Sequence, residues 1–383
     1  MTRVPVSGKN GVDGGRRGVG RSYRVIAAAG LLAGVVGVLP AAVSSATEAH
    51  GEGGFVQTNL VSNLSTVGAR LVDPAFKNPW GLAAGPATPV WVADNGTDVA
   101  TIYPGDVNGS AIVKAPLTVA VPGGAPTGQV FNPTADFVAG AATPKSPARF
   151  ILSTENGSIV AWNPATAPAA QPTTAEVEYS NPTAVYKSLA IAATLNGSFL
   201  YASNFHDGTV DVFDGAFHKV VSPGGFVDSS LPEGYAPFGI QNIHGLIYVT
   251  YALQNDERHD DVKGRGHGFI DIYTTDGFFV DRLASRGALD SPWGLVLAPA
   301  GFGRFAGKLL VGNFGDGRIN VLDALSGAFK GQLRDDHRQP IVIDGLWGLL
   351  VGNGATGGPG SVLFSAGLND EADGLLGTLT PNE

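Results

Sequence analysis

Cysteine is absent from the 383-residue sequence, and this absence excludes several kinds of chemistry at once. The chain can form no disulfide bond, use no thiolate as a nucleophile or metal ligand, and carry no lipid on a cysteine. A chain of this length can bury a hydrophobic core without disulfide bonds. The absence therefore does not argue against an extracellular protein.

Positive charge is scarce beyond the N-terminus. Residues 47–383 contain 18 Lys and Arg against 32 Asp and Glu, a difference of −14. An acidic chain repels phosphate backbones, so we expect no nucleic-acid partner. The common catalytic motifs G-x-S-x-G and H-E-x-x-H are also missing. The segment 306–310 does not make a phosphate-binding loop, because Leu309 stands where that loop has Ser or Thr.

The N-terminus carries the one long apolar run, from Val25 to Val43, which follows a basic stretch that ends at Arg24. A basic stretch, an apolar run and small residues in sequence predict a secretory signal over residues 1–46. The mature protein is then secreted and has no membrane segment. A retained membrane anchor is the alternative, because the run is nearly long enough to span a bilayer. The pair Arg16-Arg17 is also a feature of twin-arginine export signals, so that export route is a further alternative.

Turn-forming residues are abundant, with 55 Gly and 25 Pro, and they favour many short strands over long helices. Two fifteen-residue segments are nearly the same: "LYASNFHDGTVDVFD" at 200–214 and "LLVGNFGDGRINVLD" at 309–323. Each alternates apolar and polar residues around a Gly-containing reversal, which predicts a β-hairpin. Related hairpins are expected at four further places: 90–105, 149–164, 246–277 and 361–381.

A second landmark, an aromatic or bulky residue in a Pro/Gly setting, precedes each hairpin. We place it at Trp80, Thr134, Leu189, Phe238, Trp293 and Trp347, which gives a period of about 54 residues. A period of this length accommodates four strands. We therefore predict an all-β fold, a six-bladed β-propeller of four-stranded blades, that occupies residues 47–383 as a single and monomeric domain. The segment 54–63 alternates apolar and polar residues, and we expect it to close the last blade as its outer strand. An open solenoid of the same units is the alternative.

Residues at equivalent positions of the repeats should meet at one end of the propeller channel. Just past the second strand of successive units stand Asp94, Glu155, Asn204 and Asn313. A ring of carboxylate and amide oxygens could hold a divalent cation such as Ca²⁺ or Mg²⁺. The alternative is that these residues cap turns, for which Asn and Asp are well suited. Likewise, Trp80, Trp293 and Trp347 could line a ligand channel, although we favour packing wedges between blades.

An insertion at 253–268 separates the two strands of the fourth hairpin and concentrates His and carboxylate groups. Long loops in compact domains are usually functional or disordered. His259 and Asp260 are the candidate catalytic residues, because an imidazole and a carboxylate can bind a metal or transfer protons. A solvated charged loop is the alternative. The segment "NDEADG" at 369–374 approaches a calcium-binding loop but has Thr380 where the closing Glu should stand.

Four stretches carry a resemblance to known proteins: 259–273, 291–323, 345–353 and 369–377. Together they resemble a conserved hypothetical family of secreted bacterial β-propeller proteins, some members of which carry a PEP-CTERM sorting tail. This chain ends at "TLTPNE" without such a tail. More distantly, the repeats are similar to NHL-type and gluconolactonase-like propellers. In the latter, Glu, Asn and Asp hold a divalent ion at the channel mouth, and the resemblance implies those parts for Glu155, Asn204 and Asn313.

These observations lead to two functional hypotheses. The first is a secreted propeller that binds a small molecule or an extracellular polymer at one channel mouth. The second is a divalent-metal-dependent hydrolase or lactonase, in which Glu155, Asn204 and Asn313 hold the ion while His259 or Asp260 moves protons. A purely structural envelope protein is a third interpretation.

Overall fold

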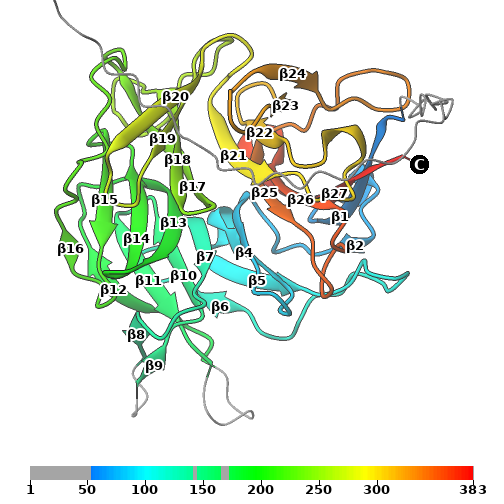
Figure 1. Cartoon of the computed structure of the whole chain (residues 1–383). Helices are drawn as coiled ribbons and strands as arrows, with labels where there is room; N and C mark the ends of the chain where they lie inside the picture. Colours follow the sequence, from blue (N-terminus) through cyan, green and yellow to red (C-terminus); the bar gives the residue numbers. More distant parts are fainter. Residues whose placement is uncertain (1–52, 141–144, 165–171, 383) are drawn as a thin grey trace, which may run out of the picture. The chain divides into compact units, whose positions relative to one another are not determined.

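The computed structural model describes residues 53–140, 145–164 and 172–382, so the predicted signal sequence at 1–46 lies outside the described residues. The described residues form 27 strands, three short 3-10 segments and one four-residue helical segment. Six small antiparallel sheets stand in a ring (Figure 1). The predicted six-bladed β-propeller is confirmed. No helix in the described part of the chain is long and apolar enough to cross a membrane.

Each blade runs from an inner strand on the axis to an outer strand at the rim. Blade 1 consists of β3 (Pro79–Ala83), β4 (Val90–Asp94), β5 (Val99–Tyr103) and β6 (Val119–Ala120). Blade 2 consists of β7 (Pro126–Phe131), β10 (Phe150–Thr154), β11 (Ser158–Trp162) and β12 (Glu176–Ser180). Blade 3 consists of β13 (Tyr186–Thr194), β14 (Gly197–Asn204), β15 (Thr209–Phe213) and β16 (Lys219–Val220).

The second half of the ring follows the same order. Blade 4 consists of β17 (Tyr235–Ile243), β18 (Leu246–Leu253), β19 (Phe269–Tyr273) and β20 (Phe279–Ser285). Blade 5 consists of β21 (Pro292–Leu297), β22 (Leu309–Asn313), β23 (Ile319–Leu322) and β24 (Phe329–Gln332). Blade 6 consists of β25 (Leu346–Val351), β26 (Val362–Gly367), β27 (Asp373–Pro381) and β1 (Phe55–Ser62).

The N-terminal strand closes the ring, as predicted from residues 54–63. β1 pairs antiparallel with β27, from Phe55 opposite Pro381 to Ser62 opposite Leu375. β2 (Leu71–Val72) then adds a short parallel pair outside β1. The last blade is therefore built from both ends of the described chain, which leaves no open edge between the first and last blades.

The two similar fifteen-residue segments form the β14–β15 hairpin of blade 3 and the β22–β23 hairpin of blade 5, two blades apart. Two of the six landmarks were placed wrongly. The inner strand of blade 2 is β7, whose Thr127 is equivalent to Trp80, whereas Thr134 lies in a turn beyond it. That turn is made by Asn132, whose Oδ1 accepts hydrogen bonds from the backbone N–H and the hydroxyl of Thr134.

The second misplaced landmark is in blade 3. Leu189 pairs with Ala202 in the register in which Leu82 pairs with Val92, so the residue equivalent to Trp80 is Lys187. A propeller blade need not repeat its residue type at each position, because only the backbone path has to be kept. The Asn-Pro dipeptide of blade 2 and the bulky Leu189 resemble the landmark of the other blades in residue type. They do not stand at the equivalent position of the inner strand.

Hydrophobic cores lie between neighbouring blades rather than within one blade. The core of blades 2 and 3, for example, joins Ile151 and Ile159 of one blade to Leu189 and Leu200 of the next. Hydroxyl groups of the second strands also bond the inner strand of the next blade: Ser203 Oγ donates to Phe238 O at 2.7 Å and Ser365 Oγ donates to Trp80 O at 2.5 Å. Each blade thus buries its faces only against its neighbours.

Smaller elements decorate this ring. β8 (Val138–Ala139) and β9 (Ser146–Pro147) pair in a two-stranded ribbon inserted into blade 2. The 3-10 segments are η1 (Ser65–Val67), η2 (Asn95–Thr97) and η3 (Gly303–Phe305). The segment α1 (Leu368–Glu371) connects β26 to β27 and contains non-helical backbone angles.

Candidate functional site

A cluster of aromatic rings closes the axis of the ring. Trp80, Trp293 and Trp347 lie on the inner strands of blades 1, 5 and 6, and their rings touch one another. Trp80 stacks on Trp347 at 3.6 Å between ring centroids, and Trp293 meets Trp347 edge-on at 5.7 Å. Phe314 stacks on the same Trp347 ring at 3.8 Å. These rings separate the two ends of the axis.

The three tryptophans come from the consecutive blades 5, 6 and 1, and their rings pack against one another where these blades meet at the axis. They fill the centre because they occupy equivalent inner positions, and six inner strands converge there. Their exposed fractions are only 2%, 7% and 2% for Trp80, Trp293 and Trp347. A ligand that entered the axis from either end would contact these rings at the bottom of its site. Their part in ligand binding stays a prediction.

Lys187 occupies the corresponding inner position of blade 3, where its ammonium group is buried on top of the aromatic cluster. The side chain is 2% exposed, and Nζ lies 5.2 Å from the centroid of the Trp80 ring. Nζ donates to Glu155 Oε1 at 2.5 Å and to Asp260 Oδ1 at 3.2 Å. Burial by itself lowers the pKa of Lys187, but the charges of Glu155 and Asp260 outweigh it and the pKa is raised. Lys187 therefore carries its positive charge at neutral pH.

Glu155 from blade 2 and the insertion of blade 4 meet at this charge. Ligand atoms of Glu155, His259 and Asp260 all lie within 4.8 Å of one another. His259 Nδ1 lies 2.9 Å from Asp260 Oδ1, and Asn95 Nδ2 donates to Glu155 Oε2 at 3.0 Å. Burial raises the pKa of Asp260, but Lys187 and His259 together bring it below its usual value. Three sequence candidates from two blades thus form one cluster.

Two carboxylates and one imidazole are a ligand set that suits a transition ion such as zinc or manganese better than Ca²⁺ or Mg²⁺. The Lys187 ammonium, however, is bonded to one oxygen of each carboxylate. Its positive charge lies between the two carboxylates, where the charge of a bound metal ion would lie. A cation bound here would compete with Lys187 for these two carboxylates.

Blade 6 completes the site through a strained turn. Asn369, Asp370 and Glu371 have φ values of 55°, 51° and 66°, three successive left-handed residues without a glycine. This turn directs Glu371 Oε2 onto Asn78 Nδ2 at 2.7 Å, and Asn78 Oδ1 accepts from Trp347 Nε1 at 3.3 Å. Burial raises the pKa of Glu371. Left-handed non-glycine backbone is costly and concentrates at functional sites.

The other predicted ion ligands are engaged elsewhere. Asp94 is fully buried, and its Oδ2 accepts from Thr101 Oγ1 at 2.5 Å. Asn204 Nδ2 donates to Asp207 Oδ2 at 2.9 Å within its own hairpin. Asn313 Nδ2 donates to Asp316 Oδ1 at 2.9 Å in the same way. The contacts of Asn204 and Asn313 are those of turn-capping residues, whereas Asp94 bonds Thr101 across the β4–β5 pair and makes no capping bond. Glu155 is therefore the member of the predicted ring that joins the cluster at Lys187.

Sequence reasoning missed Lys187, Asn78 and Glu371. Lys187 had a signal, because it is the one basic residue at the inner position that carries Trp80, Phe238, Trp293 and Trp347 in other blades. Misplacing the landmark at Leu189 hid it. Glu371 lies inside the segment 369–374, which resembles a calcium-binding loop. The direction of its side chain depends on the left-handed turn, and no sequence pattern predicts that turn. We call the residues gathered at this end the Lys187 mouth: Asn78, Asn95, Glu155, Lys187, His259, Asp260 and Glu371.

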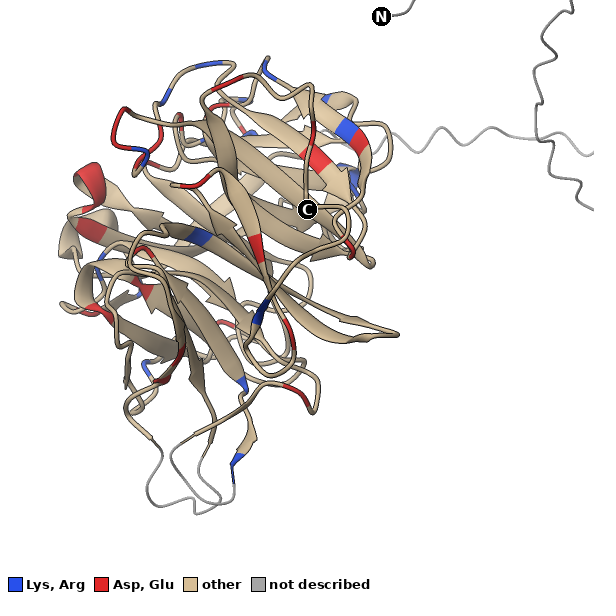
Figure 2. Cartoon of the chain, turned by 90° about the vertical axis from the view of Figure 1, so that its left-hand side faces the viewer, with Lys and Arg blue, Asp and Glu red and all other residues tan. Residues whose placement is uncertain are grey.

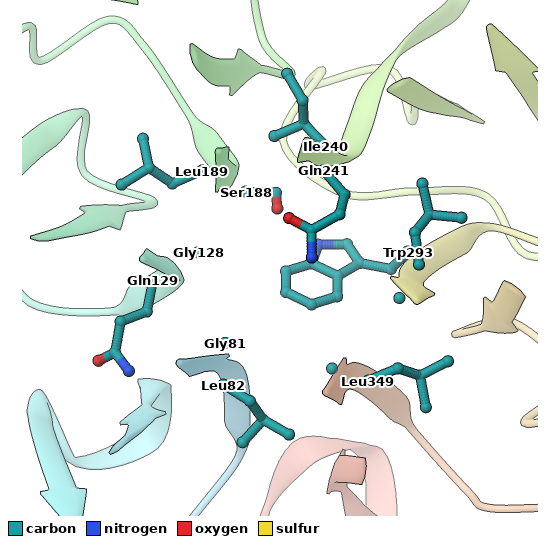
Figure 3. A pocket seen from close by; sticks show the side chains of 13 residues that line it. Gly81, Leu82, Gly128, Gln129, Ser188, Leu189, Ile240, Gln241, Trp293 and Leu349 are labelled. Atoms are coloured by element: carbon teal, nitrogen blue, oxygen red, sulfur yellow. The ribbon is translucent and has the colours of Figure 1, made fainter. Parts of the chain in front are cut away.

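The opposite side of the aromatic cluster has a different lining. Glycines of the inner strands, among them Gly81, Gly128 and Gly294, line a small cavity of about 40 Å³. Figure 3 shows Gln241 and Trp293 extending toward its middle, while Leu82 and Leu349 point outward. A cavity of this volume holds one or a few water molecules. The charged groups therefore gather at the Lys187 mouth and not in this cavity.

Comparison with solved structures supports the fold alone. A glucose dehydrogenase has a TM-score of 0.50 at 14% identity, with 86% of this chain and 100% of that chain covered. A streptogramin B lyase has a TM-score of 0.48 at 12% identity, with 86% and 97% covered. Both are β-propeller proteins. No protein-family model matches the chain.

Two relatives are closer in sequence. The uncharacterised protein R648 of Acanthamoeba polyphaga mimivirus is 32% identical over 333 residues, which are 85% of this chain and 80% of that protein. The uncharacterised protein L690 of the same virus is 31% identical over 334 residues, 85% of each chain. The resemblance to secreted bacterial propellers stays a prediction beside these viral relatives. With this identity over most of both lengths, the chain belongs to the family of R648 and L690.

Proposed function

We propose that the protein binds a small, uncharged, hydroxyl-bearing ligand at the Lys187 mouth. The observation that carries this proposal is the buried Lys187 ammonium, bridged to Glu155 and Asp260 from two other blades. Burying an ammonium group is costly, and a folded protein keeps one where its bonds serve structure or recognition. The position at the centre of one end favours recognition.

The mouth offers a mixed set of hydrogen-bonding groups. Glu155 and Asp260 accept, Lys187 donates, and Asn78 and Asn95 can do both. Hydroxyl groups are suited to such a set because each both donates and accepts. Lys187 and Lys263, whose ammonium lies 4.1 Å from the Phe314 ring centroid, offset most of the charge of Glu155, Asp260 and Glu371. Near-balanced charge disfavours a strongly charged ligand, and a saccharide is the class that fits best.

The insertion at 253–268 forms part of the mouth, because it supplies Asp260 and His259. Both side chains are about half exposed, at 62% and 47%. A ligand that approaches Lys187 therefore meets these two groups. Deleting residues 255–267 should abolish binding, and unchanged binding would show that the insertion takes no part.

The test is a saturation-transfer NMR screen of neutral mono- and disaccharides, followed by calorimetry on each hit. We expect at least one sugar to bind, and Glu155→Gln to weaken its binding about tenfold, a typical loss for one charged hydrogen bond. Glu233→Gln is the matched control, since Glu233 is exposed and outside the mouth. Absence of any hit, or equal affinity in Glu155→Gln, would overturn the proposal.

A metal-dependent hydrolase or lactonase is the second candidate, favoured by the cluster of Glu155, His259 and Asp260. A bound ion there would polarise a carbonyl group or activate water. Elemental analysis should then find about one equivalent of zinc, manganese, calcium or magnesium, lost in Glu155→Gln and kept in Glu233→Gln. Metal-free protein that gains no thermal stability from any of these ions would exclude this candidate.

Secretion is proposed on the N-terminal pattern alone. Export with removal of residues 1–46 would release a protein that starts near Thr47. Intact mass of the protein from the culture medium tests this. Recovery of the full-length chain from the membrane fraction would favour the anchor instead.

A further inference from the structure

A basic groove runs along blade 5, apart from the Lys187 mouth. Three hollows of about 470, 370 and 300 Å³ follow one another. The first two share Arg265 and Phe329, and the last two share Arg334, so the three hollows are neighbours on one face, and we treat them together. Residues of β20, β23 and β24 line the first hollow, and residues of β24 line the second. We call the three hollows the arginine groove, after their six arginines: Arg265, Arg286, Arg304, Arg318, Arg334 and Arg338.

The charge of this groove is opposite to that of the chain. The whole sequence has 33 acidic and 24 basic residues, a net charge of −9. In Figure 2 charged residues appear as short, scattered segments on a ribbon that is mostly uncharged. Six arginines and two residues with carboxylates, Asp316 and Asp335, line the groove. The Arg286 guanidinium also lies over the Phe269 ring, 5.3 Å from its centroid. A concentration of like charge costs repulsion, which a bound anionic partner would relieve.

Three of the arginines are anchored by one N–H group each. Arg265 Nε donates to Gly287 O at 3.3 Å, and one Nη of Arg318 lies 2.9 Å from Asp316 Oδ2. One Nη of Arg334 donates to Arg338 O at 2.7 Å. A guanidinium has five N–H groups in a fixed plane, so each anchor orients the plane and leaves other donors for a ligand. Such oriented forks match carboxylate and other planar or tetrahedral anions.

The groove also offers a flat apolar contact and neutral polar groups. Phe329 borders the first two hollows and is 54% exposed. Gln332 lies in the second hollow, where its Nε2 donates to Asn320 Oδ1 at 2.9 Å. An exposed aromatic ring can pack against the face of a sugar ring, and amides can bond its hydroxyl groups.

We propose that the arginine groove binds an acidic oligosaccharide, a linear chain whose successive sugar units carry carboxylates. Spaced arginines fit a ligand with one charge per unit, and Phe329 with Gln332 fits the sugar between charges. A nucleic-acid strand is disfavoured because single-strand binding uses several stacking rings, whereas the ring that borders these hollows is that of Phe329.

The test titrates the full chain with a galacturonic acid hexasaccharide by calorimetry. We expect binding that weakens as NaCl is raised, because the contacts are ionic. The double variant Arg265→Gln/Arg334→Gln removes the arginines shared between hollows and should weaken binding about tenfold or more. The matched control is Lys145→Gln/Arg149→Gln, which makes the same charge change at exposed residues of blade 2. It should bind like the unchanged protein.

Two further ligands make the result decisive. The methyl-esterified hexasaccharide has the same sugars without charge, and it should not bind measurably. An oligothymidylate should bind more weakly than the galacturonate. The proposal is overturned by no galacturonate binding, by equal binding of the methyl ester, by equal losses in the two double variants, or by tighter binding of the oligonucleotide.

Discussion

The ammonium of Lys187 lies 2.5 Å from the carboxylate of Glu155, although the two residues belong to different blades and Lys187 is almost wholly buried. Glu155 is held from its other oxygen by Asn95 of blade 1. One ion pair thus links three consecutive blades at the end of the ring where the functional groups gather.

Replacing Lys187 with Met should destabilise the protein by about 3 kcal/mol, because Glu155 would lose its buried partner. The double variant Lys187→Met/Glu155→Gln should recover part of this loss, since no uncompensated charge remains. Urea unfolding of the four proteins measures the coupling. Additive losses would show that the two residues do not depend on each other.

Asp94 should make stability depend on pH. Burial raises its pKa well above the usual value, with Thr101 only partly opposing this. As pH rises above the pKa of the unfolded chain, the unfolded state ionises while the folded state keeps its proton, so stability falls. Asp94→Asn removes this fall and should stabilise the protein by about 1–3 kcal/mol near pH 7, with a smaller gain near pH 4.

Thermal unfolding of Asp94→Asn at both pH values checks the expectation. The matched control is Asp256→Asn, the same substitution at an exposed position of the insertion, which should change the melting temperature little. An equal gain at both pH values would mean that Asp94 ionises normally in the folded protein.

Gly348→Ala should loosen the packing of blade 6 against blade 1. A Cβ at this position would lie 2.6 Å from Trp80 O and 2.7 Å from Ser365 Oγ, closer than real contacts allow. We expect a loss of about 3 kcal/mol from the forced shift of backbone. Gly354→Ala is the control, because nothing lies within 4 Å of its Cβ and its φ is not left-handed. Comparable stability of the two variants by calorimetry would contradict this packing.

Asp370→Gly should stabilise the turn that carries Glu371. Asp370 is exposed and has φ of 51°, a conformation that glycine adopts without strain. We expect a gain of about 1 kcal/mol, reduced by the greater freedom of glycine in the unfolded chain. Glu371→Gly relieves the same strain but removes the bond to Asn78, so it should gain less. A lower melting temperature for Asp370→Gly would show that its side chain matters more than its backbone.

The sequence by itself determined the ring. Alternating apolar residues and regularly spaced hairpins imply blades that must stack on one another, and the alternation at 54–63 identified the strand that closes them. Periodicity carries this information because every blade has to bury both faces. The sequence also indicated Glu155, His259 and Asp260 as candidates. Glu155 follows the second strand of a repeat, and His259 and Asp260 lie in the charged insertion.

Only the tertiary structure decided how those groups meet. Lys187 lies on the inner strand of blade 3, yet its charge is neutralised by blades 2 and 4, a relationship between residues 32 and 73 positions apart. Glu371 reaches Asn78 through a left-handed turn at the other end of the chain. Ion pairing and backbone strain depend on distances in space, which a repeat pattern does not specify, and so the site emerged only once the blades stood around one axis.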